Sequence, residues 1–317
     1  MALFDKILEH SAKARNLLET AKEASLPGLQ GVPVYYVVQF FIHEIKRDVL
    51  IVKSKAIAFS FFLALFPALI FLLTLIPYIP IDGLQENMIV LLRDILPANA
   101  YELLDQTLTD TIQRPRGGLL SIGFLTALFI SSSGMIGVME SFDKSIETFH
   151  TRNALQMRWV AFKLTFVIFF LTMISVALIV EGNRLLEIIA EDWLKLGAWS
   201  VTLLSTFKWL IILFLIFNTY SFIYYYGPAT KKKWNFMSTG STVATILTII
   251  FSLGFSYFVN NFGTYNKLYG SIGTIIALQF WIYLNSFALL IGFEINASIT
   301  YNKHLILKKD DEALAED

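Results

Sequence analysis

Four polar side chains in the last long apolar stretch of the sequence have a spacing that suits binding or transport. Gln279, Tyr283 and Ser286 recur at intervals of four and three residues, which places them on one face of a helix, and Asn285 lies beside them. Glu294 follows about two turns later. An amide or carboxyl group in lipid is costly without a hydrogen-bond partner, so these side chains are expected to face the interior of a bundle. There they either contact a substrate or form structural interhelical hydrogen bonds.

Charges and prolines near the other apolar stretches add to this candidate site. Lys163 and Arg158 begin the third stretch at the depth where Glu294 ends the sixth, so an ion pair could lock two helices or open as a gate. Pro67 interrupts the first stretch, where a kink serves either packing or a substrate pathway. The residues predicted to form a cavity or gate are Gln279, Tyr283, Asn285, Ser286, Glu294, Lys163 and Pro67.

The residues needed for hydrolytic or redox chemistry are missing or scattered. The chain has no cysteine, and His10, His43, His150 and His304 stand apart in segments outside the apolar stretches. None of them belongs to a zinc-binding or nuclease motif, and no phosphate-binding glycine loop is present. We therefore predict no catalytic, metal or cofactor-binding residues and no enzyme activity. The net charge of zero gives no reason to expect nucleic acid as a partner.

The positions of these polar residues depend on six stretches that are long and apolar enough to cross a membrane. Hydrophobic residues make up 56% of the chain and charged residues only 16%, a composition that is too apolar for a soluble protein of this size. Helices are the expected structure, because lipid cannot satisfy an open backbone. The sequence therefore predicts an all-α polytopic membrane protein. Its predicted spans are residues 56–79, 119–139, 160–180, 209–226, 239–259 and 271–293.

Lysine and arginine are distributed unequally between the two sides of these spans. Seventeen fall on the side of both termini and seven on the other side, with Lys163 left uncounted. Positive residues concentrate on the cytoplasmic side of membrane proteins. Both termini are therefore predicted to be cytoplasmic.

The segments outside the spans also show helical patterns. Residues 1–55 are expected to form cytoplasmic amphipathic helices, and residues 80–118 an external helical hairpin. Residues 56–297 would then form the transmembrane domain. A short external helix is expected near residues 185–189 and a tight external connection at 260–273. Residues 298–317 are predicted to be a cytoplasmic tail, with the acidic part, 310–317, disordered.

Several motifs resemble a known family. The stretch 238–297 reads STGSTVATILTIIFSLGFSYFVNNFGTYNKLYGSIGTIIALQFWIYLNSFALLIGFEINA, the first span contains AIAFSFFLALFPALI, and Tyr226, Gly227 and Pro228 lead to Trp234. These segments resemble the YihY/BrkB family of bacterial membrane proteins. The resemblance implies an inner-membrane location and six spans. Members of that family have carried ribonuclease BN, virulence and transport labels.

Three functions remain open at this point. The first is a transporter or translocator of an amphiphile, an envelope lipid or a small solute, with a cavity between the first, fifth and sixth spans. The second is a non-transporting scaffold for envelope assembly, and the third is a nuclease, which the scattered histidines disfavour. The expected partners are membrane lipids and a lipid or small-solute substrate. The sequence does not determine the oligomeric state.

Overall fold

The architecture was taken from a computed structural model of the 317-residue chain. The structure describes residues 25, 28–33, 35–39, 49–78, 83, 85, 86, 88–90, 105, 109–115, 117–143, 148–180, 198–260 and 263–316. The prediction of an all-α fold is confirmed: the described residues contain no β-strand, and only Phe149 and Thr230 form an isolated antiparallel bridge.

Six helices are long and apolar enough to cross a membrane, as the sequence predicted. Each has at least 22 residues, and at ~1.5 Å per residue even the shortest exceeds the ~30 Å hydrocarbon core. The helices are α4 (Val49–Leu75), α7 (Gly117–Ser141), α8 (Ala154–Val180), α10 (Ala198–Tyr226), α11 (Thr239–Asn260) and α12 (Gly263–Glu316). A turn of 3-10 helix, Ile76–Tyr78, follows α4.

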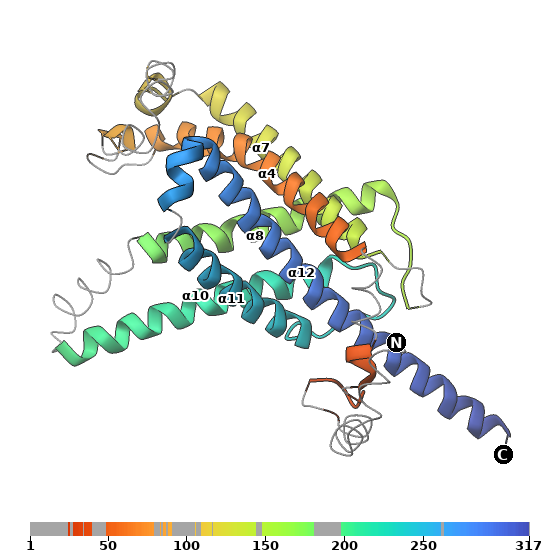
Figure 1. The fold of residues 1–317 in the computed structure, drawn as a ribbon. Helices are drawn as coiled ribbons and strands as arrows, with labels where there is room; N and C mark the ends of the chain where they lie inside the picture. The colour runs from red at the N-terminus through yellow and green to blue at the C-terminus, as the bar shows by residue number, and fades with distance from the viewer. Residues whose placement is uncertain are drawn as a thin grey trace.

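The helices pack in a ring (Figure 1). Contacts run from α4 to α7, α8, α10, α11 and α12 in turn, and α12 packs back against α4. Helices α4, α8 and α11 begin at one end of the bundle, and α7 and α10 finish there. Lys53, Arg152 and Lys233 lie at this end. We call it the basic end and the opposite one the far end.

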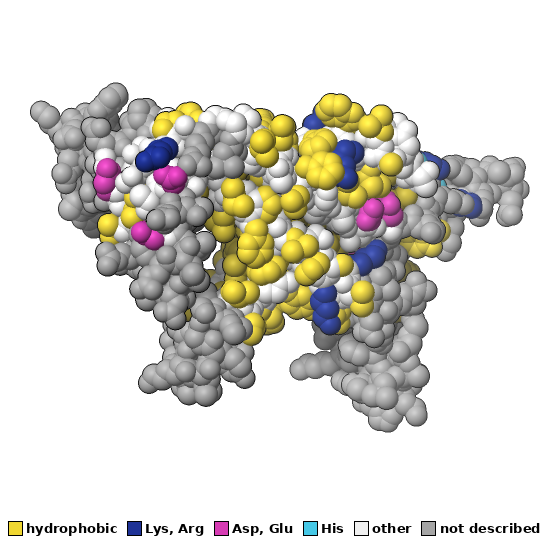
Figure 2. Space-filling view, turned by 90° about the horizontal axis from the view of Figure 1, so that it is seen from above, with side chains coloured by type: hydrophobic (Ala, Val, Ile, Leu, Met, Phe, Trp, Pro, Cys, Tyr) yellow, Lys and Arg dark blue, Asp and Glu magenta, His cyan; other side chains and the backbone are white. Residues whose placement is uncertain are grey.

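The buried core is concentrated in the half of the bundle next to the basic end. Its largest cluster combines side chains from all six helices, including Ile57, Met139, Leu164, Tyr224, Ala244 and Leu290. In α8 the last buried side chain among the described residues is that of Leu164, and in α11 it is that of Thr245. Apolar side chains cover much of the middle of the face seen in Figure 2, and several lysines and arginines lie toward its right-hand, basic end. This outer apolar surface suits contact with lipid.

The structure corrects several predicted boundaries. Helix α12 runs without a break to Glu316, so the helix does not stop where the predicted span ends, at 293, and the prediction of a disordered tail at 310–317 was wrong. The physical reason is local, since no glycine or proline follows Gly292 to stop the helix. Only residues 261–262 separate α11 from α12, so the predicted connection 260–273 was also wrong. Helix α10 begins eleven residues earlier than expected, at Ala198.

Other predictions fall mostly outside the described residues. Of residues 1–55, predicted to form amphipathic helices, the structure describes 25, 28–33, the helical residues 35–39 and residues 49–55, which are the first residues of α4. Of the predicted external hairpin, the helical residues 85, 86, 88–90, 105 and 109–113 are described. The short helix expected near 185–189 lies outside the described part.

Candidate functional site

Aromatic side chains around Phe293 fill the bundle near its basic end. The rings of Phe293 and Phe142 are stacked, with centroids 4.3 Å apart and planes 10° from parallel, and both residues are fully buried. Trp234 and Phe149 contact the same Phe293 ring at centroid distances of 5.6 and 6.4 Å. Offset and edge contacts of this kind stabilise buried aromatic clusters. These rings fill the space between the helices in the basic half of the bundle.

Two glycines bring the backbones of α11 and α12 together beside this cluster. A Cβ atom added to Gly240 would overlap the carbonyl oxygen of Gly292, and one added to Gly292 would overlap the hydroxyl of Tyr224. Small residues allow such close approach between membrane helices. Because backbone atoms cannot move aside as a flexible side chain can, this crossing fixes the two helices against each other.

A buried amide strengthens the same crossing. Asn296 in α12 is 5% exposed, and its Oδ1 accepts a hydrogen bond of 2.8 Å from the backbone N–H of Gly240. Its Nδ2 donates to the hydroxyl of Ser238 at 2.9 Å. The first N–H groups of a helix have no partner within the helix. Asn296 therefore caps α11 from a different helix.

Arg152 holds the loop that follows α10. Its Nη1 donates to the carbonyl of Gly227 at 2.7 Å, and its Nη2 donates to those of Tyr226 and Pro228 at 3.1 and 3.0 Å. Burial lowers the pKa of the Arg152 guanidinium, and the charge of Asp143 opposes this shift. Burial likewise raises the pKa of the Asp143 carboxyl, against the charges of Arg152 and Lys53. A guanidinium fork suits several carbonyls at once, so Arg152 keeps this loop in one conformation.

The predicted polar residues of the last span lie on α12, and the structure pairs two of them within their own helix. Asn285 donates to the carbonyl of Trp281 at 2.9 Å, and Ser286 donates to that of Ile282 at 2.8 Å. Gln279 differs from both, because its Oε1 is buried without a hydrogen-bond partner among the described residues. An unsatisfied buried carbonyl is costly, which marks Gln279 as a site for a further polar group.

The other two predicted residues of α12 have different surroundings. Tyr283 lies in a column of rings, with centroids 6.2 Å from Phe280 and 6.3 Å from Phe287. Glu294 is only 3% exposed and follows Phe293 directly, within the closed half. The predicted residues therefore extend along α12 from the closed half to the open half described below.

The two basic residues proposed as partners of Glu294 both lie on α8. Arg158 in α8 donates to the hydroxyls of Ser132 and Ser133 in α7 at 3.2 and 3.0 Å, and it lies 4.8 Å from the ring centroid of Phe129. Lys163 is exposed on α8. Arg158 thus joins α7 to α8, and its proposed pairing with Glu294 stays a prediction.

Pro67 lies within α4, which continues past it to Leu75. Its ring removes the backbone hydrogen bond that would reach the carbonyl of Leu63. The residue is half-buried. A kink for packing and a free carbonyl for a ligand both remain open as its role.

Helix α12 changes from buried to exposed along its length. From Ala288 to Glu294 every side chain is buried, whereas five in the far half are exposed. The exposed five are Ile275, Ile276, Leu278, Phe280 and Trp281. At ~100° per residue these five positions point in all directions around the helix. In Figure 1, α10 diverges from α4 and α7 toward the same end, with α12 between them. Helix α12 is thus enclosed by other helices from Ala288 to Glu294, in what we call the closed half of the bundle, and exposed at five positions from Ile275 to Trp281, in what we call the open half.

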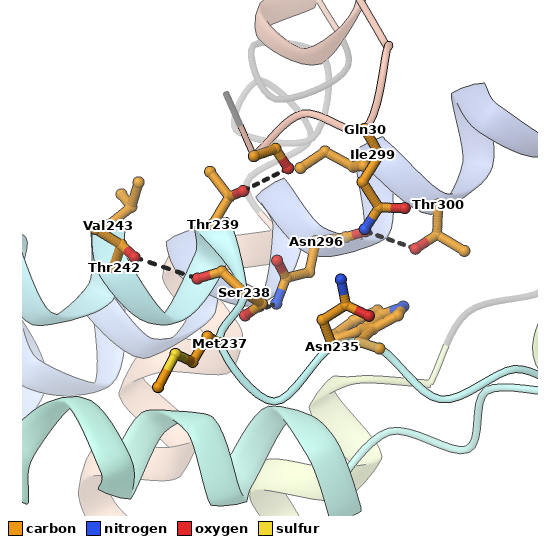
Figure 3. A pocket seen from close by; sticks show the side chains of 12 residues that line it. Gln30, Asn235, Met237, Ser238, Thr239, Thr242, Val243, Asn296, Ile299 and Thr300 are labelled. Carbon is orange, nitrogen blue, oxygen red and sulfur yellow. Dashed lines mark hydrogen bonds between the residues drawn. The ribbon is translucent and has the colours of Figure 1, made fainter. Parts of the chain in front are cut away.

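A pocket of about 370 Å³ with a mixed polar and apolar lining lies at the basic end, beside the glycine crossing. Residues near Gln30, the start of α11 and the middle of α12 form its walls, and Asn296 lies between α11 and Thr300 in Figure 3. Thr239 at its rim donates to the carbonyl of Gly28 at 2.8 Å. The sequence did not predict this pocket.

Within the described residues, no three histidine, cysteine, aspartate or glutamate side chains lie close enough together to hold a metal ion. His150 is held through its backbone, whose N–H donates to the carbonyl of Ala229 at 2.8 Å.

Comparison with known proteins identifies the family. The family described as Virulence factor BrkB matches residues 41–316, which is most of the chain. The chain belongs to the BrkB family. This confirms the resemblance seen in the sequence and makes the chain an integral membrane protein of that family.

Several curated BrkB-family relatives are similar over long regions. The ribonuclease-like protein YfkH of Bacillus subtilis (strain 168) is 32% identical over 253 residues, covering 80% of this chain and 91% of YfkH. The UPF0761 membrane protein VP0125 of Vibrio parahaemolyticus is 23% identical over 277 residues, or 84% of each chain. A UPF0761 membrane protein of Tolumonas auensis is 26% identical over 148 residues, 45% of this chain and 47% of that one. No solved structure matches.

Reasoning from the sequence missed the residues that join α11 to α12 in this BrkB-family chain. Asn296 lies just beyond the predicted end of the last span and was not included in the site, although an intramembrane amide is a signal for interhelical bonding. Gly240 and Gly292 carried no signal of their own, because only the register between two helices makes them meet.

Proposed function

We propose that this BrkB-family chain is a translocator of an amphiphilic lipid in the bacterial inner membrane, with its basic end facing the cytoplasm. The observation that supports it is the change along α12, where every side chain from Ala288 to Glu294 is buried and five side chains from Ile275 to Trp281 are exposed. Carriers that use alternating access are closed on one side of the substrate at a time. The aromatic cluster around Phe293 would be the closed gate.

The open half suits an amphiphile better than a free solute. Its exposed side chains are mostly apolar, so the acyl chains of a lipid can stay against them while the polar group enters between helices. Gln279 offers an unpaired carbonyl to that polar group, and Glu294 lies deeper, at the gate. The proposed path therefore follows α12 from Gln279 toward Glu294.

A reconstitution experiment tests the proposal. Purified protein is placed in liposomes that contain phosphatidylglycerol with a fluorescent acyl chain, and dithionite is added outside. Translocation is expected to expose inner-leaflet label, so proteoliposomes should lose fluorescence that protein-free liposomes keep. Equal protection in both, with the protein shown to be folded by its melting curve, would contradict lipid translocation and favour a non-transporting scaffold.

The orientation is tested separately with single cysteines, since the natural chain has none. Lys232 is exposed at the basic end, and Thr109 precedes α7 on the other side. An impermeant maleimide added to intact cells is expected to label Thr109→Cys and to spare Lys232→Cys, because positive residues favour the cytoplasmic side. Labelling of Lys232→Cys alone would show the reverse orientation, and lysed cells should label both.

A further inference from the structure

The pocket at the basic end is lined by polar and apolar side chains and by no charged one. Twelve residues form it, and none is aspartate, glutamate, lysine or arginine. The lining includes the amides of Gln30, Asn235 and Asn296 and the hydroxyls of Ser238, Thr242 and Thr300. Neutral amides and hydroxyls can both donate and accept hydrogen bonds. Such a lining suits an uncharged ligand with several hydroxyl groups better than an ion.

Several of these polar groups are already held in position. Asn296 is fixed by Gly240 and Ser238, and the hydroxyl of Thr300 donates to the carbonyl of Asn296 at 2.9 Å. Lys303 donates to Oε1 of Gln30 at 3.1 Å. The hydroxyl oxygens keep acceptor capacity after these bonds form. The pocket wall is therefore organised before any ligand binds.

Two lining residues have unused hydrogen-bonding groups. Trp234 is 9% exposed, and its indole Nε1–H has no hydrogen-bond partner among the described residues. Asn235 is exposed next to it, and its amide makes no hydrogen bond with the described residues. Nearly all buried donors in proteins have a partner, so the indole N–H points to a missing one.

The same tryptophan supplies a second element of recognition. A flat aromatic face packs against the C–H groups of a sugar or glycerol unit while the surrounding polar groups bind its hydroxyls. Trp234 also contacts Phe293, so the pocket wall is continuous with the aromatic cluster that closes the bundle.

We propose that this pocket binds an uncharged, polyhydroxylated group, namely a sugar or glycerol unit. Such a group can be the headgroup of a lipid or a free molecule, and the chemistry of recognition is the same. The proposal concerns binding only and does not depend on translocation.

Native mass spectrometry of the full chain released from nanodiscs tests it. One set of nanodiscs contains monoglucosyl diacylglycerol in phosphatidylcholine, a second contains phosphatidylserine instead, and a third contains phosphatidylcholine with free methyl glucoside. The wild-type protein is expected to retain the glucolipid or the free glucoside in preference to phosphatidylserine. Retention of the lipid alone identifies a headgroup site, and retention of the glucoside as well identifies a site for the free unit.

Two variants locate the site. Trp234→Phe keeps an aromatic ring but removes the indole N–H together with its five-membered ring, and it is expected to weaken glucose binding by about tenfold. Trp281→Phe is the matched control, because it removes an indole N–H that donates to Ser252, away from the pocket. Equal binding by wild type and Trp234→Phe, equal loss in both variants, or stronger retention of phosphatidylserine would overturn the proposal. Absence of glucose binding by a folded wild-type protein would overturn it too.

Discussion

Replacing Gly292 with alanine is expected to destabilise the folded protein by about 3 kcal/mol, the upper end of the usual range for an overpacked core. The added Cβ would lie 2.5 Å from the carbonyl oxygen of Gly240 and 2.8 Å from the Cβ of Ala244, and would overlap the hydroxyl of Tyr224. That hydroxyl also donates to the carbonyl of Leu289 at 2.6 Å, so moving it breaks a buried hydrogen bond. The midpoint of thermal unfolding in detergent measures the loss.

Gly254→Ala is the matched control for this change. Gly254 lies in α11, and nothing comes within 4 Å of a Cβ atom added there. Alanine also favours helix over glycine, so this variant should melt at or slightly above the wild-type temperature. If both variants melted together with the wild type, the close crossing of α11 and α12 would be wrong.

Replacing Gln279 with leucine is expected to lower lipid translocation about tenfold or more, which corresponds to ~1.4 kcal/mol in the barrier. The stability of the folded protein should not fall. Oε1 of Gln279 has no partner among the described residues, and an unpaired buried group costs ~1–3 kcal/mol. Removing it should leave the unfolding temperature unchanged or raised. The dithionite assay and a melting curve on the same preparation measure both quantities.

Asn218→Leu serves as the control for that variant. Asn218 is another intramembrane amide, on α10, and its Nδ2 donates to the carbonyl of Phe214 at 2.7 Å, as Asn285 does to its own helix. This variant should keep translocation. A Gln279→Leu protein that loses stability together with activity would assign Gln279 a structural role, and one that loses neither would remove it from the path.

The number and type of the membrane helices could be predicted because hydropathy over a span-length window is a strong signal. Their ends could not, since the same helix continues wherever nothing breaks it. Leaving lipid does not end a helix, and α12 extends 23 residues beyond Phe293 for that reason. The predicted fourth span began at residue 209, yet α10 begins at Ala198 and contains Lys208 as a buried residue.

The candidate site was harder to predict than the fold. Polar side chains on α12 can be predicted to face inward because their exposure to lipid is costly. Oε1 of Gln279 and the side chain of Glu294 are both buried. The sequence does not predict whether such a side chain bonds to its own helix or to a neighbouring one. Asn285 and Asn296 have the same side chain and differ only in the groups that face them. Asn285 turns back to its own helix, and Asn296 meets the start of α11. Only the packing of two helices decides this.

The unbroken length of α12 gives the chain a mechanical lever. The helix is fastened to α11 at Gly292 and Asn296, and 20 residues, or ~30 Å at ~1.5 Å each, extend beyond Asn296 to Glu316. A tilt of ~10° about this attachment would move the outer tip through ~5 Å. A rearrangement in the open half of the bundle would thereby move the end of α12 outside the membrane, where another molecule could bind it.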